Sequence, residues 1–190
     1  MKILLPILLL LSFNSFADDS FKIWGGVFSK TSINDHFSYW IEDQLRLNGD
    51  ALGTNQFLFR TGPLQRINDQ HELGYLYAFI KTGNVLEHRF TFQHGQKYSK
   101  TMSHRARLEL RTFENRKPKY RGRYLFRFNQ GKLVVWDELF VNLSPEFEFD
   151  RNRLFIGLKS QFGTMRFEYG YLAQSISETT QHVATIYAFF

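Results

Sequence analysis

The sequence predicts an all-β protein, an antiparallel transmembrane β-barrel of 10–12 strands, and three observations support this fold class. Nearly every segment alternates apolar and polar residues with period two, which is typical of strands with two different faces. The segments run for about 10–13 residues, close to the ~9–11 of a tilted membrane strand and longer than the ~5–6 of soluble strands. The apolar faces are rich in aromatic residues, since the chain holds 21 Phe and 9 Tyr among 190 residues.

Eleven segments carry the alternation, and turn residues such as Gly83-Asn84 and Gly163 separate them. The expected strands span 20–31, 36–48, 55–65, 70–82, 85–96, 101–114, 119–129, 132–143, 150–162, 164–176 and 181–190. Because bacterial single-chain barrels have even strand numbers, these segments predict 10 or 12 strands. The first segment, which contains Gly25-Gly26, has the weakest pattern of the eleven.

The segment 103–113 shows the pattern most clearly. Three arginines and a glutamate occupy every second position from 105 to 111, and Ala106, Leu108 and Leu110 fill the gaps. A soluble sandwich or a lipocalin-like barrel would turn the apolar face inward, whereas a membrane barrel turns it toward lipid and directs the charges into the lumen. Strand length and aromatic content favour the membrane barrel, with Leu108 and Leu110 facing lipid.

Two aspartates interrupt the apolar faces. Asp43 and Asp137 fall in phase with the residues expected to face lipid, and a carboxylate is costly at the bilayer midplane. We therefore expect these two residues to lie near the rims, or a β-bulge to shift the register beside them.

The two ends of the chain point to a bacterial outer membrane. Residues 1–17 combine Lys2, an apolar stretch through Leu11 and small residues at positions 15 and 17, which is typical of a cleaved secretory signal peptide. Residues 18–190 then form a single barrel domain. The chain ends on Phe190 after apolar residues at alternate positions; this ending resembles the C-terminal signature that the barrel-assembly machinery reads in outer-membrane barrels.

Composition excludes several other classes of protein. The chain has no cysteine, so disulfides and thiolate metal sites are absent. The net charge is +6, but basic residues are interleaved with glutamate, and we expect no nucleic-acid partner. The six histidines show neither metal-ligand spacing nor a Ser-His-acid arrangement, so we expect no metal, no cofactor and no enzyme activity.

Several sequence pieces together resemble a known family. They match in order and spacing over the mature chain: "ELGYLYAF" (72–79), "EHRFTFQ" (87–93), "RARLELR" (105–111), "WDELFVNL" (136–143), "FDRNRLFIGL" (149–158) and "FEYGYLAQ" (167–174). The chain resembles a family of predicted Gram-negative outer-membrane β-barrel proteins classed as a domain of unknown function. The resemblance implies a barrel in contact with outer-membrane lipid and lipopolysaccharide, and it implies no activity.

The charged faces define the candidate functional residues. Those expected to line the lumen are Glu42, Arg46, Glu87, Arg89, Arg105, Arg107, Glu109, Arg111, Arg121, Arg123, Arg127, Glu138, Arg153 and Glu168, with Arg60, Glu72 and Arg166 on the same faces. Arginine pairs with carboxylates through its planar fork, so such residues can form a polar core.

The charge pattern leaves three functional hypotheses open. The barrel is a narrow, anion-preferring pore, or its Arg/Glu pairs plug it and its role is structural. In a pore, the expected selectivity residues are the neighbours Arg105, Arg107, Arg121 and Arg123, with Glu109 as the acid beside them. The alternative class is a membrane-embedded hydrolase acting on lipid or lipopolysaccharide, which would need a Ser/His/acid constellation at the outer rim.

Overall fold

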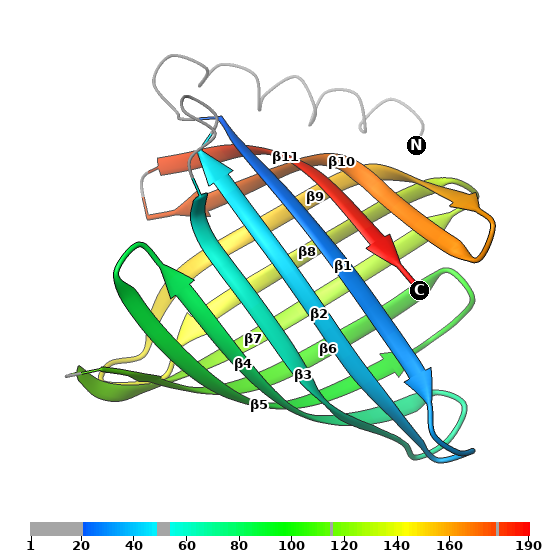
Figure 1. Cartoon of the computed structure of the whole chain (residues 1–190), viewed down its shortest axis with the longest axis horizontal. Helices are drawn as coiled ribbons and strands as arrows, with labels where there is room; N and C mark the ends of the chain where they lie inside the picture. Colours follow the sequence, from blue (N-terminus) through cyan, green and yellow to red (C-terminus); the bar gives the residue numbers. More distant parts are fainter. Residues whose placement is uncertain (1–20, 49–53, 115, 178) are drawn as a thin grey trace, which may run out of the picture.

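The computed structural model describes residues 21–48, 54–114, 116–177 and 179–190, which form a closed barrel of eleven strands (Figure 1). The expected signal peptide, residues 1–17, lies outside the described residues. The strands are β1 (Lys22–Ser32), β2 (Phe37–Asn48), β3 (Thr54–Arg66), β4 (His71–Thr82), β5 (Val85–Lys97), β6 (Met102–Phe113), β7 (Arg116–Gln130), β8 (Leu133–Asn142), β9 (Glu148–Phe162), β10 (Met165–Ile176) and β11 (Thr179–Phe189).

The predicted all-β barrel is confirmed, and each of the eleven alternating segments is a strand. Gly83, Gly131 and Gly163 occupy tight turns with positive φ angles of 55°, 57° and 59°, a region where glycine has no steric cost. These glycines belong to three of the turn signals in the sequence. No helix among the described residues has the length and apolar character needed to cross a membrane.

The expected even number of strands is wrong. Among the described residues eleven strands close the barrel, and the doubted first segment is one of them. With an odd number, the first and last strands run in the same direction, so closure requires a parallel pair. β1 and β11 supply it, in register from Lys22↔Val183 to Phe28↔Phe189, and all other neighbours are antiparallel (Figure 1).

The start of β1 and the end of β11 lie at opposite openings of the barrel. We call the end where β11 finishes the C-terminal opening; the turns at 33–36 and 67–70 lie there too. The other end, where β1 begins, is the N-terminal opening. The interior path between these two openings contains the candidate site.

The outer surface of the barrel is mainly apolar. Large side chains that include Tyr75, Phe90, Leu108 and Ile186 are each about half exposed there, and Leu108 thus points outward as expected. The inward face of the same strands carries the buried polar residues. The alternation therefore builds a barrel with an apolar exterior.

The expectation for the two aspartates is wrong. Asp43 pairs with Val27 and Phe59 near the middle of β2, away from the register shift at Arg46/Leu47. Asp137 also lies in the middle of its strand, where Asn152 Nδ2 donates a hydrogen bond to it at 2.9 Å. Both carboxylates face outward at mid-height, because regular pairing continues through them.

The interior also contains apolar side chains, which the expected Arg/Glu lumen did not include. β1 and β8–β11 turn an apolar cluster inward: Trp24, Val134, Trp136, Phe155, Leu172 and Val183. The rings of Trp136 and Phe155 stack with centroids 5.1 Å apart. A Cβ at Gly157 would lie 2.4 Å from the Phe155 ring, so this glycine leaves space for the phenylalanine. We call these five neighbouring strands the apolar side, although Glu138, Arg153 and Glu168 also line the cavity from them. We call β2–β7 the charged side, although β3 and β4 hold a smaller apolar cluster of Leu58, Ala78 and Ile80.

Candidate functional site in the barrel interior

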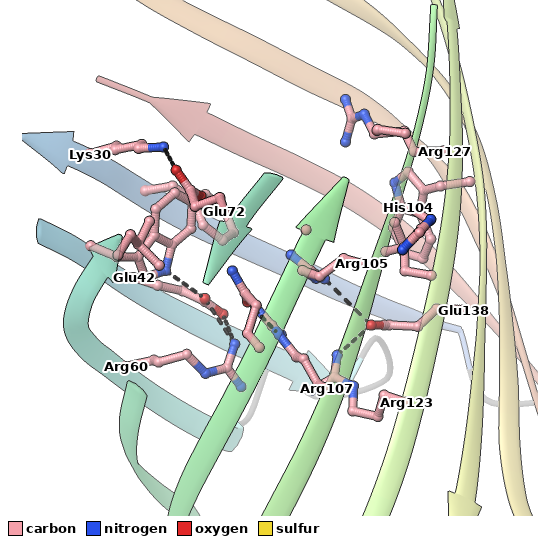
Figure 2. Close-up of a pocket in the computed structure, with 18 of the residues that line it drawn as sticks. Lys30, Glu42, Arg60, Glu72, His104, Arg105, Arg107, Arg123, Arg127 and Glu138 are labelled. Carbon is pink, nitrogen blue, oxygen red and sulfur yellow. Dashed lines mark hydrogen bonds and ion pairs between the residues drawn. The ribbon is translucent and has the colours of Figure 1, made fainter. Parts of the chain in front are cut away.

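A cavity of about 700 Å³ occupies the space beside the charged side. It begins at the C-terminal opening, where Asn34 and Asn68 line it, and extends to Gln56 and Arg111 near the N-terminal opening. Figure 2 shows arginine and glutamate side chains from several strands directed into this space. Residues near both openings of the barrel therefore line the cavity.

The structure places the predicted lumen residues around this cavity. Thirteen of them line its wall: Glu42, Arg46, Glu87, Arg89, Arg105, Arg107, Arg111, Arg121, Arg123, Arg127, Glu138, Arg153 and Glu168. Glu109 does not contact the open space, because its arginine partners cover it and it is 0% exposed. Of the three further residues on the charged faces, Arg60 and Glu72 also line the wall.

Glu109 is the centre of the densest charge cluster. Arg121 Nη2 donates to its Oε2 atom at 2.7 Å, and Arg123 Nη1 donates to its Oε1 atom at 2.7 Å. Arg89 Nη1 lies 3.7 Å from Oε1. These residues come from β5, β6 and β7, whose registers bring their inward positions together. One carboxylate therefore balances part of the charge of three buried arginines.

Other carboxylates hold most of the remaining arginines. Arg60 Nη1 donates to both oxygens of Glu42, at 2.8 and 2.9 Å. Glu138 Oε1 accepts from Arg123 Nη2 at 2.7 Å and from Arg105 Nη2 at 3.4 Å (Figure 2). Such contacts join strands that are not neighbours, as between β6 and β8, and so tie the wall together across the interior.

Further ion pairs lie toward the two openings. Glu87 accepts from Arg89 Nη2 and from Arg111 Nε, each at 2.7 Å, on the side of the N-terminal opening. Arg127 pairs with Glu168 toward the C-terminal opening. The network therefore extends over much of the barrel's height.

Apart from the exposed Arg66 at the C-terminal opening, three arginines on the cavity wall have no carboxylate partner among the described residues. Arg107 donates only from Nε, to Gln93 at 2.8 Å. Arg46 donates to Gln44 and Gln56, and Arg153 Nε donates to Gln174 at 2.7 Å. The hydrogen bonds of all three guanidinium groups go to neutral amide oxygens, which leave their positive charge in place.

Trp24 contacts two of these three arginines. The Cζ atoms of Arg46 and Arg153 lie 4.0 and 4.9 Å from its ring centroid. Such cation–π contacts favour the charged guanidinium without neutralising it. The charged and apolar sides of the interior meet at this tryptophan.

The four arginines that the sequence grouped as selectivity residues differ in their carboxylate partners. Arg121 and Arg123 are bonded to carboxylates, and Asp150 adds a second partner to Arg121 at 2.9 Å. Arg105 has a longer contact at 3.4 Å, and Arg107 has none. Glu109 is therefore not the single acid near this group.

Sequence reasoning missed Asp150 because alternation assigns it to the outer face. A register shift between Phe140 and Val141 of β8 places this residue of β9 out of phase. It also missed the inward aromatic residues, although Trp24, Trp136 and Phe155 are in phase with the charged faces and offered a readable signal.

Three histidines, His71, His94 and His104, lie side by side near the C-terminal opening: ring centroids are 5.3 Å apart for His71 and His94 and 5.7 Å apart for His94 and His104. His71 bonds His94, with 3.0 Å between ring nitrogens, and His88 bonds Tyr77 at 2.6 Å. His104 bonds Tyr98. In the part of the chain that the structure describes, no group of three His, Cys, Asp or Glu side chains has an arrangement suited to a metal ion.

The comparisons with known proteins identify a family and no activity. A family model described as "Protein of unknown function (DUF2490)" matches residues 21–184. No curated protein matches the chain. The match covers ten of the strands completely and part of β11. The chain therefore belongs to this family of proteins of unknown function.

Proposed function

We propose that the chain is a bacterial outer-membrane β-barrel that provides a narrow, anion-preferring passage. One observation carries the proposal: among the described residues, basic side chains on the cavity wall outnumber acidic ones by 14 to 7. Pores that select anions or phosphate are lined by Arg and Lys. The apolar exterior supports membrane insertion, because lipid-facing residues of such barrels are apolar.

The positions of the arginines without carboxylate partners support movement of anions along the cavity. Arg107 lies in the middle of β6, whereas Arg46 lies near the end of β2 at the N-terminal opening. Arg153 of β9 lies close to Arg46, because the guanidinium groups of both residues contact Trp24. An anion that enters from the C-terminal opening thus meets successive positive charges, and several weak sites favour conduction over trapping.

The proposal includes the route to the membrane. The chain is secreted with the signal peptide at 1–17, which is then removed, and the assembly machinery recognises the segment that ends at Phe190. The mature barrel contacts lipid and lipopolysaccharide through its apolar exterior.

The test is single-channel recording of the refolded chain, residues 18–190, in a planar bilayer with a KCl gradient. We expect discrete conductance steps and a reversal potential that favours chloride. Arg107→Glu should shift the reversal potential toward potassium, because it reverses a charge on the cavity wall. Lys81→Glu is the matched control: Lys81 is exposed and does not line the cavity. A folded barrel that stays electrically silent would overturn the passage and leave a plugged structural barrel.

A further inference from the structure

We propose that Arg60, Arg105 and Arg107 form a binding site for a small solute that carries a phosphate or carboxylate group. The inference deepens the proposed function, since it assigns a ligand class to the same cavity. The three residues come from β3 and β6, and Figure 2 shows Arg105 and Arg107 in the cavity between the Glu42–Arg60 pair and Glu138.

No carboxylate among the described residues forms an ion pair with Arg107. Its side chain is 5% exposed, and its single hydrogen bond goes to the neutral Gln93. A guanidinium removed from water is costly without an opposite charge. A bound oxyanion would supply that charge, and arginine is well suited to bind one because its fork matches two oxygens at once.

Unused donors surround the same position. Three nitrogens are buried and make no hydrogen bond to any residue that the structure describes: Arg60 Nε, Arg60 Nη2 and Arg105 Nε. Arg60 uses only Nη1 for Glu42, and Arg105 reaches Glu138 only at 3.4 Å. Small rotations of these two side chains would direct N–H groups to a ligand without loss of both ion pairs. Buried donors are rarely left unsatisfied, so their clustering beside Arg107 indicates a polar ligand.

The surroundings limit which ligand fits. The carboxylates of Glu42 and Glu138 flank the three arginines and would repel an anion that approached them directly. Each of them is already paired with arginine, so the available positive charge is concentrated at Arg107. The cavity, about 700 Å³, is open toward the C-terminal opening and admits a small metabolite but not a polymer of appreciable bulk. A compact solute with one or two oxyanion groups meets these conditions.

Titration calorimetry of the refolded barrel in detergent micelles tests the site. The probes are inorganic phosphate and malonate, which separate the two oxyanion chemistries, and sodium chloride at equal ionic strength is the reference. We expect saturable binding of at least one probe. Arg107→Gln should weaken it about 10- to 100-fold, the effect expected for lost hydrogen bonds between charged groups. Arg107→Lys should give an intermediate loss, because it keeps the charge and loses the fork.

Lys81→Gln removes an exposed charge outside the cavity and should leave binding unchanged. The β-sheet circular dichroism of each variant must match the parent, and if Arg107→Gln fails to fold, Arg107→Lys decides. Parent barrel that binds neither probe, or Arg107 variants that bind like the parent, would overturn the site. Micelle binding does not depend on conduction: a silent barrel that binds phosphate contradicts the passage alone, and a conducting barrel that binds no probe contradicts the site alone.

Discussion

The charged side and the apolar side of the interior use the same strand alternation and are stabilised in opposite ways. On β2–β7 many inward positions hold arginines and glutamates that form ion pairs with one another, as around Glu109. On β1 and β8–β11 many of them hold apolar residues such as Trp136 and Phe155, which fill space. Apolar side chains fill part of this barrel of intermediate width. The cavity remains open beside the charged side. The difference teaches that stability on one side depends on charge balance and on the other side on volume.

The largest effect is expected from Glu109→Gln, which keeps the size of the side chain and removes its charge. The change leaves Arg121 and Arg123 with weaker partners in a buried place, and the loss of one partner of a buried ion pair costs about 3–5 kcal/mol. We expect a loss near the upper end of this range, because two close contacts are lost together. Urea unfolding in lipid vesicles measures it.

Glu146→Gln is the control for this substitution, since Glu146 is exposed in the β8–β9 turn. It should change the free energy of unfolding by less than about 0.5 kcal/mol. If Glu109→Gln is equally harmless, the charged side does not depend on charge balance, and the comparison between the two sides fails.

Phe155→Ala tests the apolar side and should cost about 3 kcal/mol. Phe155 is fully buried and stacks on Trp136, so its removal leaves a cavity beside Gly157. The same unfolding measurement applies, and Phe147→Ala, which truncates a side chain that is 81% exposed, is the matched control. A small loss at Phe155 would mean that the apolar side is loosely packed and that the barrel has a second open path.

Strand positions were readable from the sequence because each strand has one apolar and one polar face, and turn residues lie between them. The closure was not readable. The pairing of Lys22 with Val183 joins residues at opposite ends of the chain, and no local pattern encodes it. The even-number rule then misled, because it describes barrels that close with antiparallel strands.

The site was predictable as a set of residues and not as a network. Alternation placed Arg105, Arg107 and Arg123 on one inward face, but it could not reveal that Glu138 of β8 reaches two of them. Contacts across the interior depend on barrel width and strand tilt, which a single strand does not encode. The sequence therefore could not show that Arg107 lacks a carboxylate partner, because this depends on which residues the nearby carboxylates bind.

The smallest effect concerns the outer surface, where Asp43 interrupts the apolar exterior. Ile41 and Leu45 beside it are about 40% exposed, so a membrane barrel would bring this carboxylate against hydrocarbon at mid-height. Asp43→Leu should then stabilise the barrel in lipid vesicles by about 1–2 kcal/mol, somewhat less than the ~2–4 kcal/mol scale of lipid-facing Arg or Lys. Asp137→Leu is the matched variant and should gain less, because it removes the hydrogen bond from Asn152. If Asp43→Leu gives no gain in stability, the outer face of β2 does not contact hydrocarbon. The charged and apolar sides of the interior would then belong to a barrel whose exterior faces something other than lipid.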